Sequence, residues 1–270
     1  NIWQPLMTAA RARGELSPEL EERFAWEILL GKDRSVNAFA LPGGYMGVHL
    51  GLMGVVSSRD ELASVLAHEL SHVTQRHISR LMTQQNRQTP WLIGAMILGA
   101  LAASKSPDAA NALVVGGQAV AAQNQLNFSR DMEREADRVG YGVMTQAGYS
   151  GQGFVGMFEK LQNASRINDN GSFPYLRSHP LTTQRIADMQ SRQHMDAAAA
   201  VPVPLAMDHA MLAARARVLS NPGADVLRLW VAEPDTHSFK TMEPARQAAS
   251  LYAATRASIQ QREFERARTL

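Results

Sequence analysis

The chain has 270 residues, 45% of them hydrophobic and 19% charged, which is enough for one large domain or two smaller ones with a sizeable core. Its 27 basic and 25 acidic residues leave a formal net charge of only +2, and no lysine or arginine block alternates with aromatic residues, so we expect no nucleic-acid partner. The sequence contains no cysteine, which excludes disulfides, iron–sulfur clusters, thiolate zinc ligands and a cysteine nucleophile.

Short strands are predicted near the N-terminus. Residues 24–30 form either a short helix or a strand. The alternating, glycine-rich stretch that follows predicts strands over residues 36–41 and Tyr45–His49, joined by a turn at residues 42–44. A small β-sheet is therefore expected before the helical part of the chain.

One long helix is predicted over residues 57–85. Ser58 or Asp60 can cap its first turn, and acidic residues follow at once, as is typical of a helix N-terminus. Two weakly polar stretches come next, at residues 90–103 and 109–122, and together they predict a helical hairpin. The first is shorter than the about 20 residues that span a bilayer, so we favour buried core helices over membrane insertion.

The remaining chain is predicted to be mainly helical. Thr182 or Thr183 can cap a helix that follows a loop over residues 168–180. Residues 197–206, which contain two prolines, have the composition of an interdomain linker, and the chain is predicted to be helical from Asp208 onward. The other expected helices cover residues 127–148, 152–162 and 181–195.

The motif HELSH, at residues 68–72, carries the first indication of chemistry. On a helix His68 and His72 lie one turn apart on one face, so both imidazoles can reach one zinc ion. Glu69 lies about 100° round the helix, where a carboxylate can act as a general base toward a water molecule at the metal. The alternative is an amphipathic helix with surface histidines. His77 falls off this face, and we expect a structural or surface role for it.

A catalytic zinc ion needs a third protein ligand, and a second acidic helix offers one. Glu133 can be that ligand, and Asp137, one turn later, can accept the ring N–H of a ligand histidine and so fix its tautomer. Glu135 competes as a ligand but falls on a different face. Alternatively, these carboxylates are solvated charges beside Arg134 and Arg138.

Three motifs in this order resemble the HtpX and CAAX-prenyl-protease group of zinc metallopeptidases, and most closely its BepA-type branch. They are HELSH, EREAD at residues 133–137 and SHPLTTQRI at 178–186, and the strand-and-turn sequence at 36–49 is also similar. The resemblance covers roughly residues 20–195. It implies one zinc ion held by His68, His72 and Glu133, with Glu69 as the catalytic base. It further implies an α+β, mainly helical, gluzincin-type domain with a small β-sheet.

The resemblance also implies a setting and a substrate. Membrane-embedded members have several spanning helices, which this chain lacks at adequate length, so it fits the soluble, periplasmic branch with C-terminal tetratricopeptide repeats. Expected substrates are unfolded or misassembled proteins, with outer-membrane assembly machinery as a partner. The strand residues Asn37, Ala38, Phe39 and Ala40 can pair with an extended substrate. The apolar hairpin over residues 91–122 then covers the active-site cleft or contacts the membrane surface without spanning it.

His179 is placed next to the cleft by the same resemblance. Pro180 restricts it to extended backbone. Its ring can donate a hydrogen bond to the oxyanion of the reaction, or it can be a fourth zinc ligand that holds the enzyme inactive. A capping or surface histidine is the alternative, since a histidine before proline is common in loops.

The C-terminal tail has the spacing of a tetratricopeptide repeat, with an amphipathic helix pair as the alternative. The residues at that spacing are Tyr252, Ala257, Phe264 and Ala267. The sequence thus predicts a metallopeptidase domain over 1–196, a linker over 197–206 and a helical region over 207–270 that belongs to a longer natural protein. A chaperone or adaptor with a silenced zinc site is the rival function, and an aminopeptidase lacks a clear carboxylate to hold the substrate amine.

Overall fold

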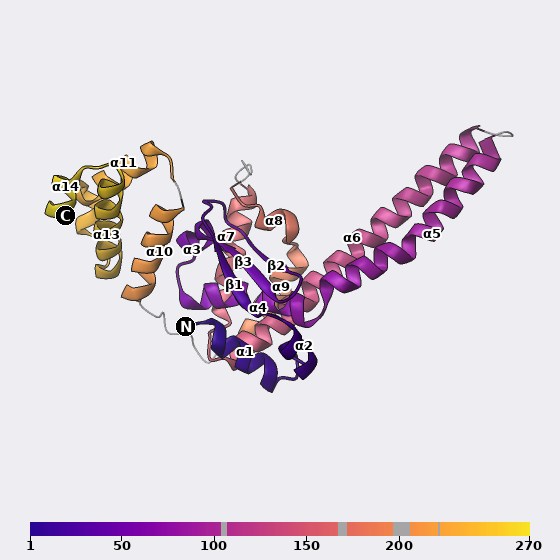
Figure 1. Cartoon of the computed structure of the whole chain (residues 1–270), viewed down its shortest axis with the longest axis horizontal. Helices are drawn as coiled ribbons and strands as arrows, with labels where there is room; N and C mark the ends of the chain where they lie inside the picture. The colour runs from indigo at the N-terminus through magenta and orange to yellow at the C-terminus, as the bar shows by residue number, and fades with distance from the viewer. Residues whose placement is uncertain (104–106, 167–171, 197–205, 221) are drawn as a thin grey trace.

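The computed structural model describes residues 1–103, 107–166, 172–196, 206–220 and 222–270. A small sheet and the helices around it form the body of the molecule, with a long helical hairpin projecting on one side and a helical C-terminal region on the other (Figure 1). The expected α+β class with mainly helical content is confirmed. The helices of the body and hairpin are α1 (Trp3–Ala12), α2 (Pro18–Arg23), α3 (Leu50–Val55), α4 (Arg59–Thr74), α5 (His77–Ala103), α6 (Pro107–Gln146), α7 (Gln152–Arg166), α8 (Tyr175–Ser178) and α9 (Thr183–Asp196).

The sheet has three strands in the order β1-β3-β2. Strand β1 (Glu27–Gly31) runs parallel to β3 (Tyr45–His49), and β2 (Ala38–Leu41) pairs antiparallel with β3. The strand alternative for residues 24–30 is therefore correct, although the strand begins three residues later than that range. Gly43 and Gly44 both have positive φ, which explains why the tight turn between β2 and β3 contains glycine. Both β1 and β2 lie at edges of the sheet.

Helix α4 lies at the centre of the body. Ser58 caps it, because its Oγ accepts a hydrogen bond of 3.1 Å from the amide of Glu61. Most of its side chains are buried, including Leu66 and Leu70, and burial of each such leucine contributes about 1.5–3 kcal/mol. The alternative of a surface helix is therefore wrong.

The predicted single helix over residues 57–85 is also wrong, because the chain breaks at Arg76. This residue has φ +55, in the left-handed region that costs a non-glycine residue about 1 kcal/mol or more. Its amide bonds to the carbonyl of Val73 at 3.0 Å and so closes α4, and α5 begins at His77. Because of this break, the side chain of His77 lies close to His72, near the end of α4.

Helix α6 crosses α4 at close range. Gly140 permits this approach, since a Cβ at that position would lie 3.0 Å from the backbone nitrogen of His68 and 3.1 Å from the carbonyl of Ala67. The residues one and two turns before Gly140 on α6 consequently face the histidines of α4. This crossing brings together two segments about sixty residues apart in sequence.

The helical hairpin of α5 and α6 is longer and more exposed than predicted. The two helices pack against each other and project away from the body (Figure 1). Trp91 is 82% exposed, and several other large apolar side chains of the hairpin are more than half exposed. The expectation of buried core helices is therefore wrong, and so is that of a cover over the active-site cleft. Among the described residues, no helix is long and apolar enough to cross a membrane.

The C-terminal region has a core of its own. Its elements are α10 (Met207–Leu219), α11 (Ala224–Ala232), η1 (Glu233–Asp235), α12 (His237–Lys240), α13 (Pro244–Gln260) and α14 (Phe264–Thr269). Small residues such as Ala214, Ala253 and Ala257 let α10 and α13 pack closely. Phe264 is 54% exposed, so the tetratricopeptide assignment stays a prediction. The predicted linker lies almost wholly outside the described residues, and the domain division likewise stays a prediction.

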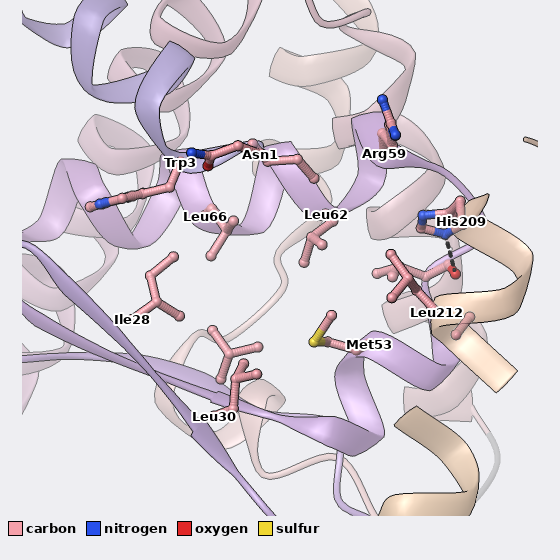
Figure 2. A pocket seen from close by; sticks show the side chains of 14 residues that line it. Asn1, Trp3, Ile28, Leu30, Met53, Arg59, Leu62, Leu66, His209 and Leu212 are labelled. Atoms are coloured by element: carbon pink, nitrogen blue, oxygen red, sulfur yellow. Dashed lines mark hydrogen bonds between the residues drawn. The ribbon is translucent and has the colours of Figure 1, made fainter. Parts of the chain in front are cut away.

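An apolar cavity of about 290 Å³ lies where α10 meets the body (Figure 2). Ile28 and Leu30 of β1, together with Leu62 of α4, line one side, and Leu212 of α10 lines the other. His209 bonds through Nε2 to the carbonyl of Val56 at 3.0 Å beside it. Polar and apolar contacts thus both hold α10 against the body.

Candidate metal centre

The two histidines of the HELSH motif point to one place. Both lie on α4, and their Nε2 atoms are 3.0 Å apart. His68 is 2% exposed and His72 is also largely enclosed, so neither ring is a solvated surface group. One turn of helix therefore presents two nitrogen donors to the same small volume.

Two further side chains complete the cluster. Glu133 comes from α6, and His179 from the segment between α8 and α9. His179 Nδ1 lies 3.1 Å from Glu133 Oε1 and 3.3 Å from His68 Nε2, and Glu133 Oε1 lies 3.3 Å from His72 Nε2. One donor atom from each of the four residues falls within 4.8 Å of all the others.

These separations fit a single zinc ion. Four atoms placed about 2.05 Å from one ion in a tetrahedron lie about 3.3 Å from one another. For the five residue pairs other than His72 and His179, the distances between donor atoms range from 3.0 to 3.4 Å and bracket that value. The donor set of three imidazoles and one carboxylate is also one that zinc accepts. Among the described residues, this is the cluster that can hold a metal ion.

Glu69 lies beside the cluster without belonging to it. Its carboxylate is 1% exposed, and neither oxygen has a hydrogen-bond partner among the described residues. The nearest ring nitrogen is His179 Nε2, 3.4 Å from Oε1. A buried carboxylate without a hydrogen bond from the described residues is costly, and such a group beside the cluster is suited to accept a proton.

Asp137 orients His68. Its Oδ1 lies 2.9 Å from His68 Nδ1, so this ring nitrogen carries the proton and Nε2 is left to face the cluster. Burial opposes a charged ring, but hydrogen bonds to Asp137 and Glu133 outweigh it and raise the pKa of His68 to about 10. The same negative field favours a divalent cation, which competes with a proton for that nitrogen.

Arg185 holds both carboxylates in place. Its guanidinium bonds to Asp137 through Nε at 2.6 Å and through a terminal nitrogen at 2.8 Å, and it lies 3.0 Å from Glu133. Burial opposes the charge of Asp137, yet the adjacent guanidinium keeps the pKa of that carboxyl below its usual value. Removing one partner from such a buried pair leaves an uncompensated charge, which typically costs 3–5 kcal/mol.

His77 supports His72 from the other side. It is 2% exposed, so the structural alternative is correct and the surface alternative is wrong. Its Nδ1 lies 2.9 Å from His72 Nδ1, and its Nε2 lies 3.2 Å from Glu135 Oε2. If His72 donates from Nδ1, His77 accepts and in turn donates to Glu135, which leaves His72 Nε2 unprotonated toward the cluster. Glu135 thus lies outside the cluster, in the chain of groups behind it.

Two residues of the site are not predicted by the sequence patterns. Tyr175 is buried and stacks on the ring of His179, with centroids 4.5 Å apart, and burial raises its pKa. Arg185 lies within the quoted SHPLTTQRI motif, but no role was assigned to it. Its position seven residues after Ser178 gives no indication that it reaches Asp137 on another helix.

The predicted substrate strand borders the site. Ala38, Phe39 and Ala40 lie in β2, which packs against α4 and is an edge of the sheet. Asn37 lies just before the strand; its carbonyl accepts a hydrogen bond from the amide of His49, and its side-chain oxygen is buried without a described partner. Among the described residues, no strand pairs with the backbone groups along the outer edge of β2.

Residues 10–193 match Peptidase family M48. The chain is 34% identical to a beta-barrel assembly-enhancing protease of Yersinia pestis over 92% of its own length and 50% of the relative. It is 37% identical to the protein of that name from Escherichia coli K12, over 58% of the chain and 32% of the relative. It is also 28% identical to the mitochondrial metalloendopeptidase OMA1 of Saccharomyces cerevisiae, over 70% of the chain and 53% of the relative.

The chain thus spans about half the length, or less, of these relatives. The matched residues contain the sheet, α4, the whole of α6 and the segment of His179, and therefore every residue of the candidate metal centre. The family uses zinc, in agreement with the donor set found here. This chain belongs to Peptidase family M48.

Proposed function

We propose that this protein is a zinc endopeptidase that cleaves unfolded or misassembled proteins. The observation that carries the proposal is the buried, unpartnered carboxylate of Glu69 beside the cluster of His68, His72, Glu133 and His179. A structural zinc site has no use for a buried base next to it, whereas peptide hydrolysis requires one. The free edge of β2 adds a means of holding an extended substrate.

Each group has a defined part in hydrolysis. His68, His72 and Glu133 would hold zinc, which supplies Lewis acidity toward the scissile carbonyl and a nucleophilic water near neutral pH. Glu69 accepts the proton of the attacking water and returns it to the leaving amine nitrogen. Asp137 and Arg185 keep His68 and Glu133 in position while this occurs. The backbone of β2 aligns the substrate as an added strand.

The proposal predicts metal-dependent cleavage of an unfolded protein. Casein should be cleaved by the zinc-loaded protein, cleavage should fall at least about tenfold after a chelator removes the metal, and added zinc should restore it. Peptide products are followed by mass spectrometry, and bound zinc by elemental analysis. Equal cleavage by the metal-free and zinc-loaded protein would contradict the proposal, because Glu69 alone does not supply the Lewis acid.

The cellular setting is proposed from relatives whose names state a role in β-barrel assembly. We place the protein in the periplasm, with outer-membrane assembly machinery reached through the C-terminal helices. Edge pairing recognises extended conformation more than sequence, which suits clients that have not folded. The rival function, an adaptor with a silenced site, is disfavoured by the retained carboxylate of Glu69.

His179 is proposed as a fourth protein ligand. Its Nδ1 lies as close to Glu133 and His68 as those two lie to each other, which supports coordination. Four protein ligands close a zinc site, whereas catalysis needs one open position. The same ring carries Nε2 toward Glu69, so the alternative, a hydrogen bond to the oxyanion, is available once the ring moves off the metal.

Replacing His179 by alanine separates these two roles. As an inhibitory ligand, its loss should raise casein cleavage and self-cleavage by about tenfold with one zinc retained, because three ligands remain. As an oxyanion donor, its loss should instead lower kcat by about 100-fold with zinc retained. Unchanged activity together with unchanged zinc affinity would contradict both roles. Replacing the half-buried His49, which lies outside the cluster, is the matched control.

The hairpin of α5 and α6 is proposed as a peripheral membrane contact. Residues 88–104 and 109–129 contain no charged side chain, and arginines flank them at the base at Arg87 and Arg130. Exposed apolar side chains above basic residues are typical of elements that lie in the headgroup region. The exposed side chains include Trp91, Ile93, Met96, Ile97, Leu98, Val115 and Val120.

Vesicle binding tests this contact. The protein should co-sediment with vesicles that contain phosphatidylglycerol, and replacing Trp91, Met96 and Val120 by serine should weaken binding about tenfold, because apolar area is lost from the interface. Leu229→Ser, at a site 70% exposed on α11, is the control and should bind as the wild type does. Equal binding by the triple variant and the wild type would remove the hairpin from the contact.

A further inference from the structure

A hollow of about 400 Å³ adjoins the metal centre on the side of Glu133. One wall is a face of α6, formed by residues three or four positions apart that include Leu126, Arg130 and Arg134. The opposite wall is the segment from Pro180 to Arg185, which directly follows His179. Because Glu133 belongs both to this hollow and to the metal cluster, anything bound in the hollow lies beside the reacting bond.

The walls of the hollow carry more positive charge than negative charge. Arg185 is fully engaged by Asp137, Glu133 and the carbonyl of Pro180, and its side chain is 3% exposed. Glu133 is likewise surrounded by the imidazoles of the cluster and by Arg185. Neither group therefore neutralises the two remaining arginines of the hollow.

Among the described residues, no buried carboxylate engages Arg130 or Arg134, the other two cations of this wall. In the part of the chain that the structure describes, Arg130 has no ion pair, and Arg134 pairs with Asp131, whose side chain is 61% exposed. A surface ion pair of this kind is weak and easily exchanged. The two guanidinium groups lie one helical turn apart on α6, a spacing at which both can reach one anionic group.

We propose that this hollow, which we call the arginine subsite (Leu126, Arg130, Arg134, Thr182 and Gln184), binds a carboxylate of the substrate within a few residues of the cleaved bond. The proposal rests on the proposed peptidase function and names a preference within it. Guanidinium groups bind carboxylates through paired N–H donors, and the hydroxyl of Thr182 and amide of Gln184 add uncharged hydrogen-bonding groups. The carboxylate belongs either to an Asp or Glu side chain or to the C-terminus of the substrate.

Matched peptides test the preference directly. Cleavage sites are first mapped in casein, and one cleaved sequence is then made with Glu, Gln or Lys at each of the three positions on either side of the bond. At one position kcat/KM should be about tenfold higher for the Glu peptide than for the Gln peptide, and lowest for the Lys peptide. The effect is limited to about tenfold because the hollow is partly open to solvent, which screens its charge. A peptide with a free or an amidated C-terminus tests the second source of the carboxylate.

Binding gives a readout that needs no turnover. Fluorescently labelled Glu, Gln and Lys peptides are titrated into the zinc-loaded Glu69→Gln variant, and the order of Kd values should follow the order of kcat/KM. Raising the salt concentration should narrow the difference, since the attraction is between charges near solvent. Low activity of the wild-type protein therefore does not prevent the test.

Charge reversal assigns the preference to these side chains. Arg130→Gln with Arg134→Gln should remove the difference between Glu and Gln peptides, and Arg130→Glu with Arg134→Glu should make the Lys peptide the tightest ligand. Arg138→Gln is the matched control, because Arg138 lies on the same helix but pairs with Asp188 outside the hollow. Zinc content is measured for each variant, because Glu133 is a neighbour of both arginines.

The outcomes distinguish this proposal from the proposed function. Cleavage of every peptide at equal rates, with equal Kd values, would overturn the arginine subsite and leave the peptidase intact. An unaltered Glu preference in the double charge-reversal variant would also overturn it. Absence of any cleavage by zinc-loaded wild type and His179→Ala proteins would instead overturn the peptidase, whatever the peptides bind.

Discussion

Glu69→Gln should lower casein cleavage by about 100- to 10,000-fold while zinc content and fold stay unchanged. The carboxamide has nearly the shape of the carboxylate but cannot accept a proton from water, and general-base catalysis is typically worth this factor. Zinc is expected to remain because Glu69 is not among the four residues whose donor atoms converge. Initial rates are measured by product release, and zinc is measured by elemental analysis of the same sample.

The surroundings of Glu69 make this substitution a clean one. Neither carboxylate oxygen accepts a hydrogen bond from the described residues, and the amide oxygen of Gln can keep the contact with His179 Nε2, which lies 3.4 Å from Oε1. The free energy of unfolding should therefore be unchanged or slightly higher, because a buried charge is replaced by a neutral group. Glu159→Gln, at an exposed position on α7 outside the metal cluster, is the control for a general effect of losing a carboxylate. Wild-type turnover by Glu69→Gln would exclude Glu69 from the mechanism.

Local patterns predicted the elements that build the site. Alternation and a glycine turn predicted β2 and β3, and the serine cap with its acidic first turn predicted α4. Helical periodicity alone then predicts that His68 and His72 lie on one face of this helix, with Glu69 beside them. Glu133 and Asp137 were identified because the same periodicity places them on one face of the next acidic helix.

The errors arose where long-range contacts decide the structure. Apolar composition shows that a segment avoids charge, but it does not show whether the protein covers that segment, so the exposure of Trp91 on the hairpin was missed. The break at Arg76 carries no glycine or proline to indicate it. Arg185 reaches Asp137, 48 residues away, only because two helices cross, and no periodic pattern encodes that contact.

Loss of a single candidate ligand gives the second large effect. His72→Ala and Glu133→Gln should each lower zinc affinity by about 100-fold or more, because a total of roughly 10–16 kcal/mol is shared among the ligands of a zinc site. Casein cleavage should fall to the level of the chelated protein, since Glu69 then has no activated water to deprotonate. Zinc affinity is measured by competition with a chelating dye, and zinc stoichiometry after dialysis.

The neighbouring carboxylate Glu135 provides a comparison variant for this test. Glu133 and Glu135 lie two positions apart on α6, yet Glu133 is 4% exposed and points into the cluster, while Glu135 binds His77 and Arg80. Glu135→Gln should therefore retain stoichiometric zinc. Its zinc affinity should fall by at most about tenfold, because Glu135 acts on the metal only through His77 and His72. A tenfold loss is the lower end of what a group hydrogen-bonded to a ligand contributes. If His72→Ala bound zinc as tightly as the wild type does, or if Glu135→Gln lost zinc while Glu133→Gln did not, the ligand set would be wrong and the metal would have to lie on the other face of α6.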